Sequence, residues 1–216
     1  MKTALIAGAT GLVGSELLKL LLESNEYKVI HLLNRKPLNI DSTKIIEHII
    51  NFDELASLKL DFAIDHAFCT LGTTIKKAGT KENFRKVDYD YVLELGKKSK
   101  EMSFGKFLVI SSLGANPKSM IFYNRVKGEV EDELKKLSLQ HLFIFRPSLL
   151  LGDRKEHRAG EKTAIYVYKV LAQIFSGPLK KYKGVEAKKV ANAMMQKALK
   201  NEDQLKIIES DEIQNF

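Results

Sequence analysis

The sequence contains few of the residues that stabilise small secreted domains or build metal centres. Its 216 residues include a single cysteine, Cys69, and no tryptophan. One cysteine cannot form an internal disulfide, and with five scattered histidines it gives no zinc-ligand spacing. We therefore expect no metal site, and we interpret Cys69 as a small buried side chain.

Long apolar runs are also missing. No stretch of about 18 or more apolar residues occurs, so we expect no transmembrane helix and no membrane partner. The apolar N-terminal stretch is too short for a signal peptide, because it ends at Gly8. We therefore predict a cytoplasmic protein.

Positive charge is in excess, with a formal net charge of +8. The basic residues are spread along the chain, without the aromatic-interleaved stripe or zinc signature of a nucleic-acid-binding protein. We expect no nucleic-acid partner and a small-molecule substrate. A protein partner or a homo-oligomer stays open, because helix faces that form dimers resemble those that form cores.

Short apolar runs of strand length alternate with longer segments of helical spacing. Such alternation predicts βαβ units and a parallel sheet. The fold class is therefore α/β, a Rossmann-type doubly wound sheet. The expected strands are Thr3–Ala7, Lys28–Leu33, Lys44–Ile50, His66–Thr70, Phe107–Ile110 and Leu142–Arg146. The expected helices between them are Leu12–Glu23, Asn83–Ser99 and Ile121–Leu137.

The pattern becomes looser after Arg146. We expect helices at Thr163–Phe175 and Val185–Leu199 and a short strand at Leu205–Ile208. This part is too short to be a separate domain. We predict one domain over residues 1–216, in which 1–150 bind a dinucleotide and 151–216 form a small cap or substrate-side lobe.

A glycine-rich turn follows the first strand directly and opens the first helix. Its sequence is Gly8-Ala9-Thr10-Gly11-Leu12-Val13-Gly14. The first glycine allows the tight turn, the second lets the backbone approach a pyrophosphate, and the third lets helix and strand pack closely. The helix N-terminus offers free N–H groups to the phosphates. We predict that Gly8, Thr10, Gly11, Leu12, Val13 and Gly14 contact a dinucleotide.

The end of the second strand is where a Rossmann unit meets the adenosine ribose. The residues there are Asn34, Arg35 and Lys36, without the carboxylate that would favour NAD. Arg35 can bind a 2′-phosphate through two hydrogen bonds, and Lys36 adds a charge. NADP is therefore preferred over NAD. The alternative is that both cations only cover a loop surface.

Three other strand ends complete the predicted cofactor site. Asn51 and Phe52 follow the third strand, at a position that usually faces the adenine. The fourth strand runs into Thr70, Leu71 and Gly72, where glycine again allows close approach of a ligand. After the sixth strand, Pro147, Ser148 and Leu150 lie in a loop placed to contact the nicotinamide.

A Tyr-x-x-x-Lys pattern, Tyr123 to Lys127, carries the predicted chemistry. Residues four apart lie on one helix face. A nearby ammonium favours the tyrosinate form and so suits a tyrosine to acid–base work. The fifth strand ends in Ser111 and Ser112, either of which could polarise a substrate carbonyl. Serine, tyrosine and lysine together are typical of hydride transfer without a metal.

These patterns together resemble the atypical short-chain dehydrogenases/reductases, and more narrowly the small Tat-interacting-protein-like oxidoreductases. The matching segments are Gly8–Gly14, Asn34–Pro37, Cys69–Thr74, Val87–Tyr91, Ser111–Ser112, Tyr123–Glu131 and Phe145–Arg154. The resemblance implies that Tyr123 is the acid–base and that Lys127 holds the nicotinamide ribose and tunes Tyr123. It implies that Ser112, rather than Ser111, orients the carbonyl.

Two residues depart from the family pattern. Many members carry an asparagine that supports a proton relay where this chain has Asp88, and many carry aspartate where it has Asn51. We predict an NADP-dependent oxidoreductase acting on a small carbonyl or alcohol. The alternative is a non-catalytic NADP(H)-binding redox sensor. A sugar-nucleotide-modifying enzyme is less favoured, because such enzymes usually need a larger C-terminal domain.

Overall fold

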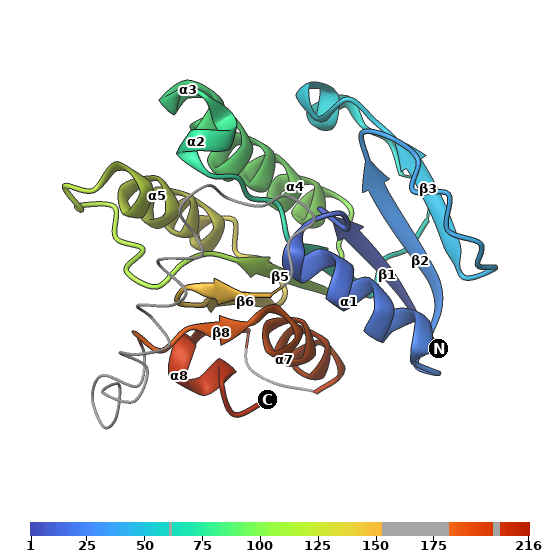
Figure 1. Cartoon of the computed structure of the whole chain (residues 1–216). Helices are drawn as coiled ribbons and strands as arrows, with labels where there is room; N and C mark the ends of the chain where they lie inside the picture. The colour runs from blue at the N-terminus through green and yellow to red at the C-terminus, as the bar shows by residue number, and fades with distance from the viewer. Residues whose placement is uncertain (61, 153–181, 201–203) are drawn as a thin grey trace.

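The architecture is a parallel sheet with helices on both faces. The computed structural model describes residues 1–60, 62–152, 182–200 and 204–216. Within these ranges seven parallel strands run in the order β3-β2-β1-β4-β5-β6-β9 (Figure 1). Their bounds are β1 (Lys2–Ala7), β2 (Tyr27–Asn34), β3 (Ile45–Ile49), β4 (His66–Cys69), β5 (Lys106–Ile110), β6 (Leu142–Arg146) and β9 (Leu205–Glu209). The predicted Rossmann-type fold class is confirmed.

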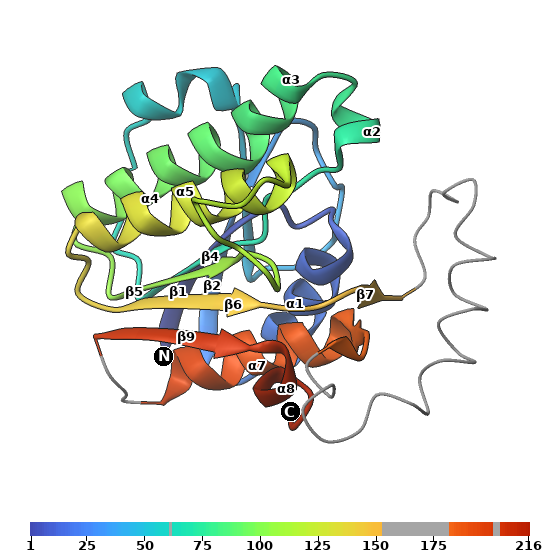
Figure 2. The same ribbon diagram turned by 90° about the vertical axis from the view of Figure 1, so that its left-hand side faces the viewer.

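Two helical layers bury the two faces of the sheet. On one face lie α1 (Leu12–Glu23), α7 (Ala187–Leu199) and α8 (Ser210–Ile213); on the other lie α3 (Lys81–Arg85), α4 (Tyr91–Glu101) and α5 (Phe122–Lys136) (Figure 2). Each layer has its own apolar core, centred on Leu17 and Phe143 on the first face and on Phe107 and Leu134 on the second. The inner strands β1, β4, β5 and β6 are largely apolar on both sides for this reason.

The C-terminal part is built into the main sheet. α7 packs against α1 with Val190 and Met194 fully buried, and β9 pairs with β6 as the predicted final strand. A helix was predicted from Val185, but Val185–Glu186 form strand β8, paired with β7 (Leu150–Leu151), and α7 begins at Ala187. The predicted helix Thr163–Phe175 lies outside the described residues, so the division into core and cap stays a prediction.

The segment predicted as one helix over Asn83–Ser99 is divided by a π-helical turn. The π turn is η2 (Lys86–Asp90), between α3 and α4, and the Tyr91 N–H bonds to the Lys86 carbonyl five residues back. A π turn holds an extra residue, so the helix changes its phase. As a result Asp88, and not the predicted Val87, is buried on the inner face.

Two further short helices were not predicted. η1 (Phe52–Ser57) follows β3, with Asn51 as its N-cap, and α2 (Ile75–Ala78) follows β4, with Thr74 as its N-cap. Both are only one or two turns long, so they show no apolar periodicity in the sequence. In the described ranges no helix is long and apolar enough to cross a membrane.

Candidate active site

The glycine turn at the end of β1 is held by its contacts with Thr70 of the neighbouring strand end. The Thr70 hydroxyl lies 3.0 Å from the carbonyl oxygens of Ala7 and Gly8. A Cβ on Gly14 would lie 2.1 Å from the Gly8 oxygen, and Gly8 itself has a φ of +94°. Gly8 and Gly14 are therefore required by the fold itself, apart from any ligand.

Gly11 differs from the other two glycines because it is exposed. A Cβ there would meet only the Gly8 oxygen, at 3.2 Å, and the Thr70 oxygen, at 3.9 Å. Gly11 is the N-cap of α1, which has no side-chain cap and no acidic residue in its first turn. Within the part of the chain that the structure describes, the first-turn N–H groups thus have no side-chain acceptor. This arrangement fits a phosphate group, as the sequence predicts.

A carboxylate from the neighbouring strand β3 lies at the end of β2, and the sequence pattern did not reveal it. Glu47, on β3, accepts hydrogen bonds at Oε2 from the Asn34 side chain and the Leu38 N–H, each at 2.9 Å. These bonds fix both ends of the short turn that carries Arg35 and Lys36, whose side chains are exposed. Glu47 lies beside β2 because β3 pairs with β2 in parallel register. Its contact with this turn could therefore be recognised only once the pairing of the two strands was known.

Asn51 and Phe52 have structural partners after β3. The Asn51 side-chain oxygen accepts from the Asp53 N–H at 3.1 Å, and its amide donates to Glu54 at 2.9 Å. Phe52 is only 6% exposed and packs against Tyr91. Contact of either residue with adenine stays a prediction. Asn51 is exposed and could offer its remaining surface, whereas Phe52 is nearly covered.

The two serines after β5 lie in different surroundings. Ser111 is buried, and its hydroxyl donates to Oε1 of Glu131. The same carboxylate binds the guanidinium of Arg146, which also pairs with Glu209 at 2.9 Å. A hydrogen bond from Arg146 to Glu131 raises the pKa of the guanidinium, and the opposing effect of burial is smaller.

Ser112 has weaker contacts. Among the described residues its hydroxyl reaches only the Leu113 carbonyl, at 3.3 Å, and its side chain is half-buried. Ser112 is therefore the serine of the two that is more available to a ligand. The placement agrees with the role that the resemblance implies for it, but that role stays a prediction.

Tyr123 and Lys127 both lie on α5, one turn apart, as predicted. Tyr123 is half-buried, with its ring 5.4 Å from that of Phe84. Lys127 is buried and its Nζ lies 2.7 Å from Oδ1 of Asp88. Burial lowers the pKa of Lys127, but the charge of Asp88, together with that of Tyr123 in its tyrosinate form, outweighs burial, so the pKa is above its usual value.

The backbone of Gly72, in the loop after β4, lies close to Lys127 and to its partner Asp88. A Cβ on Gly72 would lie 3.4 Å from Oδ1 of Asp88 and 4.0 Å from Nζ of Lys127. Gly72 belongs to the loop that begins at Thr70, which in turn contacts the glycine turn. One strand end therefore links the candidate phosphate site to the candidate catalytic lysine, with Leu71 between them.

The loop after β6 is held by backbone and hydroxyl contacts. The Pro147 carbonyl accepts from the Leu113 N–H at 2.9 Å. The Ser148 N–H donates to the Ser210 hydroxyl at 3.2 Å, and Leu150 belongs to β7. The Ser148 hydroxyl donates to the Lys183 carbonyl, so it is already engaged. The predicted contacts of Pro147, Ser148 and Leu150 with a nicotinamide stay predictions.

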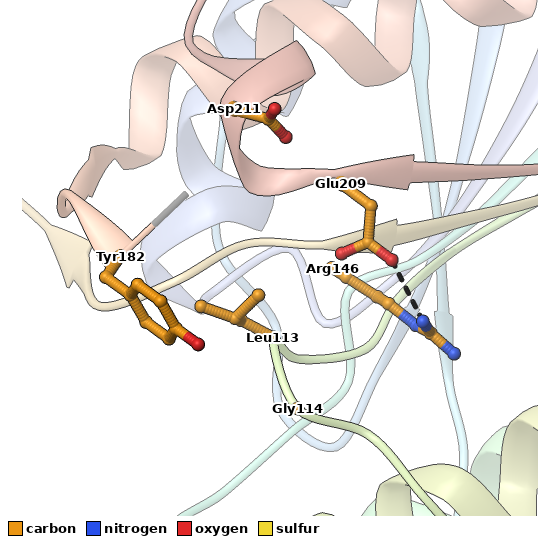
Figure 3. A pocket seen from close by; sticks show the side chains of 6 residues that line it. All are labelled: Leu113, Gly114, Arg146, Tyr182, Glu209 and Asp211. Atoms are coloured by element: carbon orange, nitrogen blue, oxygen red, sulfur yellow. Dashed lines mark hydrogen bonds and ion pairs between the residues drawn. The ribbon is translucent and has the colours of Figure 1, made fainter. Parts of the chain in front are cut away.

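A hollow of about 480 Å³ lies where β5, β6 and β9 end. Figure 3 shows the six residues that line it: Leu113, Gly114, Arg146, Tyr182, Glu209 and Asp211. Leu113 and Gly114 directly follow Ser112, and a Cβ on Gly114 would lie 3.1 Å from the Asn124 side chain, next to Tyr123 in sequence. The hollow therefore adjoins the Ser112 side of the site, whereas the glycine turn lies outside it.

Sequence comparisons find a family model and several named relatives that this chain is similar to. The model of the HIM1 family matches residues 33–182. Protein FMP52, mitochondrial, from Candida albicans is 35% identical over 212 residues, covering 94% of this chain and 92% of that protein. Protein HTATIP2 from Rattus norvegicus is 37% identical over 164 residues, covering 74% of this chain and 67% of that protein. The predicted resemblance to the Tat-interacting-protein-like members is confirmed.

Solved structures show the same fold. MoeE5 in complex with UDP-glucuronic acid and NAD superposes with a TM-score of 0.71 at 14% identity, covering 95% of this chain and 75% of that one. The Bordetella bronchiseptica enzyme WbmH in complex with NAD+ superposes with a TM-score of 0.69 at 18% identity. The match covers 97% of this chain and 76% of that one. At this identity the likeness concerns the fold alone.

The comparisons contradict the predicted location. Several relatives, from Debaryomyces hansenii, Candida glabrata and Candida albicans, are named as mitochondrial proteins. The prediction of a cytoplasmic protein was therefore wrong. It rested on the absence of a recognisable signal peptide or spanning segment, and such an absence does not determine a compartment.

Proposed function

This chain belongs to the HIM1 family, and on that premise we propose that it is an NADP(H)-dependent oxidoreductase of the short-chain dehydrogenase/reductase type. Its reaction is hydride transfer between the cofactor and a small carbonyl or alcohol. One observation supports this most. Tyr123 and the buried ammonium of Lys127 lie on one helix, and Gly72 joins Lys127 to the strand end that contacts the glycine turn.

The chain's own groups suit a dinucleotide. The uncapped N-terminus of α1 and the open backbone at Gly11 receive the pyrophosphate. Arg35 and Lys36 bind the 2′-phosphate of NADP, on a turn that Asn34 and Glu47 hold in place. When bound, the cofactor supplies the hydride donor or acceptor. Lys127 donates to its nicotinamide ribose.

Three side chains act on the substrate. Tyr123 transfers a proton between its hydroxyl and the substrate oxygen, and the ammonium of Lys127 stabilises the tyrosinate. Ser112 donates a hydrogen bond to the same substrate oxygen and so fixes its orientation. Ser111 takes no part in this step, because its hydroxyl is bonded to Glu131.

The substrate occupies the hollow beside Ser112. Its walls combine the apolar Leu113 and Tyr182 with the charged Arg146, Glu209 and Asp211 (Figure 3). Tyr182, Glu209 and Asp211 supply its C-terminal side, in keeping with a substrate-side lobe. The partner is a small molecule rather than a nucleic acid or a membrane.

The choice between NADP and NAD depends on charges from two strands. Arg35 and Lys36 favour a phosphate, whereas the carboxylate of Glu47 resembles the acceptor that favours NAD. Both hydrogen bonds to Glu47 use Oε2 and come from protein groups, so this carboxylate already serves the turn. We therefore assign the outward cations, and not Glu47, to the 2′-position.

The experiment is a measurement of NADPH consumption against a panel of aldehydes and ketones, with wild type and Tyr123→Phe. Tyr123→Phe removes the proton donor and keeps the ring. It should lower the rate by about 100-fold or more while NADPH still binds. If neither protein consumed NADPH with any carbonyl of a broad panel, the result would contradict the proposal.

A second candidate is a non-catalytic NADP(H)-binding sensor that changes partners with redox state. The observation that favours it is an exposed apolar pair directly before α5, Met120 at 95% and Ile121 at 62% exposed. This pair precedes Tyr123 by two and three residues in sequence and suits a protein contact. NADPH-dependent capture of a partner, without turnover, would support this function instead.

A further inference from the structure

The ion pair between Asp88 and Lys127 lies deep in the protein, with side chains 1% and 4% exposed. Oδ2 of Asp88 accepts from the Thr73 N–H at 2.8 Å. Oδ1 lies 2.7 Å from Nζ of Lys127 and has no other partner among the described residues. One carboxylate therefore joins three elements: the π turn η2, the loop after β4, and α5.

The π turn determines which side chain meets Lys127. In a regular helix the apolar pattern would place Val87 on the inner face, but the extra residue of η2 buries Asp88 there. π turns inside α-helices are frequent at functional sites. Here the π turn places the carboxylate of Asp88 at the buried position where the apolar pattern predicts Val87.

This negative charge governs the state of Lys127. A buried ammonium without a counter-charge tends to lose its proton. Burial does lower the pKa of Lys127, but attraction to Asp88, and to Tyr123 when that side chain is ionised, is stronger, and the pKa lies above its usual value. Cys69 adds no charge nearby, because burial raises the pKa of its thiol to about 12. Lys127 is thus charged at neutral pH and paired mainly with Asp88.

The pairing of Lys127 with Asp88 changes the electrostatic field at the Tyr123 hydroxyl. An ammonium has three N–H donors, so an interaction with Asp88 leaves the others for different acceptors. The carboxylate also opposes the positive field of the ammonium, because the two charges act on a third group with opposite signs. A tyrosinate is therefore stabilised less by the pair than it would be by Lys127 alone.

We propose that Asp88 is a positioning residue, which holds the ammonium of Lys127 in place and moderates the positive field that Lys127 presents to Tyr123. This inference rests on the proposed function, in which Tyr123 exchanges a proton with the substrate. It predicts that removing the charge of Asp88 makes Tyr123 ionise more readily, because the tyrosinate then becomes the counter-charge that keeps Lys127 protonated.

The test is a tyrosinate absorbance titration of the protein without cofactor. Asp88→Asn keeps the size of the side chain and an acceptor for the Thr73 N–H, but removes the charge. Subtracting the curve of Tyr123→Phe, measured in each background, isolates the signal of Tyr123. The midpoint in Asp88→Asn should move to lower pH by about one unit or more. An unchanged or higher midpoint overturns the inference.

A matched control is Asp90→Asn, which removes an exposed carboxylate from the same π turn and should leave the midpoint unchanged. The titration needs no turnover, so it is independent of the NADPH assay. If the midpoint moves and no carbonyl is reduced, the proposed function fails while the electrostatic coupling stands. If turnover is measurable, its pH profile should move in the same direction as the midpoint.

Loss of folding in Asp88→Asn is addressed by a thermal double-mutant cycle. Asp88→Asn and Lys127→Met each leave one buried charge unpaired, and each should lower Tm by on the order of 10 °C. The double variant removes both charges and should lose much less than the sum of the two. Additive losses would show that the two side chains are not coupled and would overturn the inference.

Discussion

The hydroxyl of Ser111 lies 2.5 Å from Oε1 of Glu131, and this buried hydrogen bond distinguishes Ser111 from its neighbour Ser112. Ser112→Ala should lower kcat/KM by about 100-fold, because a donor to the reacting oxygen is lost, with little change in stability. Steady-state kinetics and urea unfolding of the same preparation check both parts.

Ser111→Ala is the matched control for this prediction. It should lower the free energy of unfolding by about 1–3 kcal/mol, since Glu131 loses a buried donor, and it should leave kcat/KM within about threefold. The reverse pattern, with activity lost in Ser111→Ala and kept in Ser112→Ala, would exchange the roles of the two serines.

The glycine turn gives a second prediction, because its glycines have different neighbours. Gly14→Ala would place a Cβ 2.1 Å from the Gly8 oxygen and should destabilise the fold by about 3 kcal/mol or more. Gly11→Ala meets nothing closer than 3.2 Å, so it should fold and weaken NADPH binding by about tenfold or more. Thermal unfolding and NADPH fluorescence titration separate these effects. Full NADPH affinity in Gly11→Ala would argue against the phosphate site.

The choice of cofactor gives a third prediction. Arg35→Ala should raise the Kd of NADPH by roughly 10- to 100-fold, which corresponds to the loss of a charged hydrogen-bonded contact, and should change the Kd of NADH by less than about twofold. Lys28→Ala removes an exposed cation at the other end of β2 and serves as the control. Equal losses for both cofactors would remove Arg35 from the 2′-phosphate site.

A fourth prediction concerns pH and the pair of His31 and His48. His31 stacks on Phe62 and lies 2.8 Å from the His48 ring nitrogen. Burial, with a smaller effect of His48, lowers the pKa of His31 to about 4. An unfolded histidine titrates near 6.5, so the unfolded chain binds the proton first as the pH falls. Stability associated with His31 is therefore complete above about pH 6.5 and is lost toward pH 4.

His31→Gln tests this pH dependence. Between pH 6.5 and 4.5 the wild type should lose up to about 1.4 kcal/mol per pH unit through His31, in addition to losses from other groups. His31→Gln should show a correspondingly smaller slope in urea unfolding experiments. Identical slopes for the two proteins would mean that His31 titrates alike in both states.

Local patterns predicted most of the sheet and identified the residues of the candidate site. The glycine turn, the strand ends and the spacing of Tyr123 and Lys127 all depend on residues close in sequence. Strands with short, nearly continuous apolar runs, such as β1 and β6, could be placed because such runs are also local in sequence. Short elements such as α2 and η1 are determined by capping and packing, and they have no periodicity to detect.

Contacts between distant residues could not be predicted in this way. Glu47 reaches Asn34 only because β3 pairs with β2 in one register. Asp88 reaches Lys127 only because a π turn changes the phase of a helix. The sequence did single out Asp88, as a departure from the family pattern, but its partner depends on how η2 packs against α5.

A crystal structure with NADP+ bound tests most directly the central claim that the glycine turn and Tyr123 serve one cofactor. We predict the pyrophosphate at Gly11 and the N-terminus of α1, the 2′-phosphate against Arg35, and the nicotinamide ring beside Tyr123 and Ser112. A nicotinamide directed away from Tyr123, or a dinucleotide bound away from the glycine turn, would contradict the account.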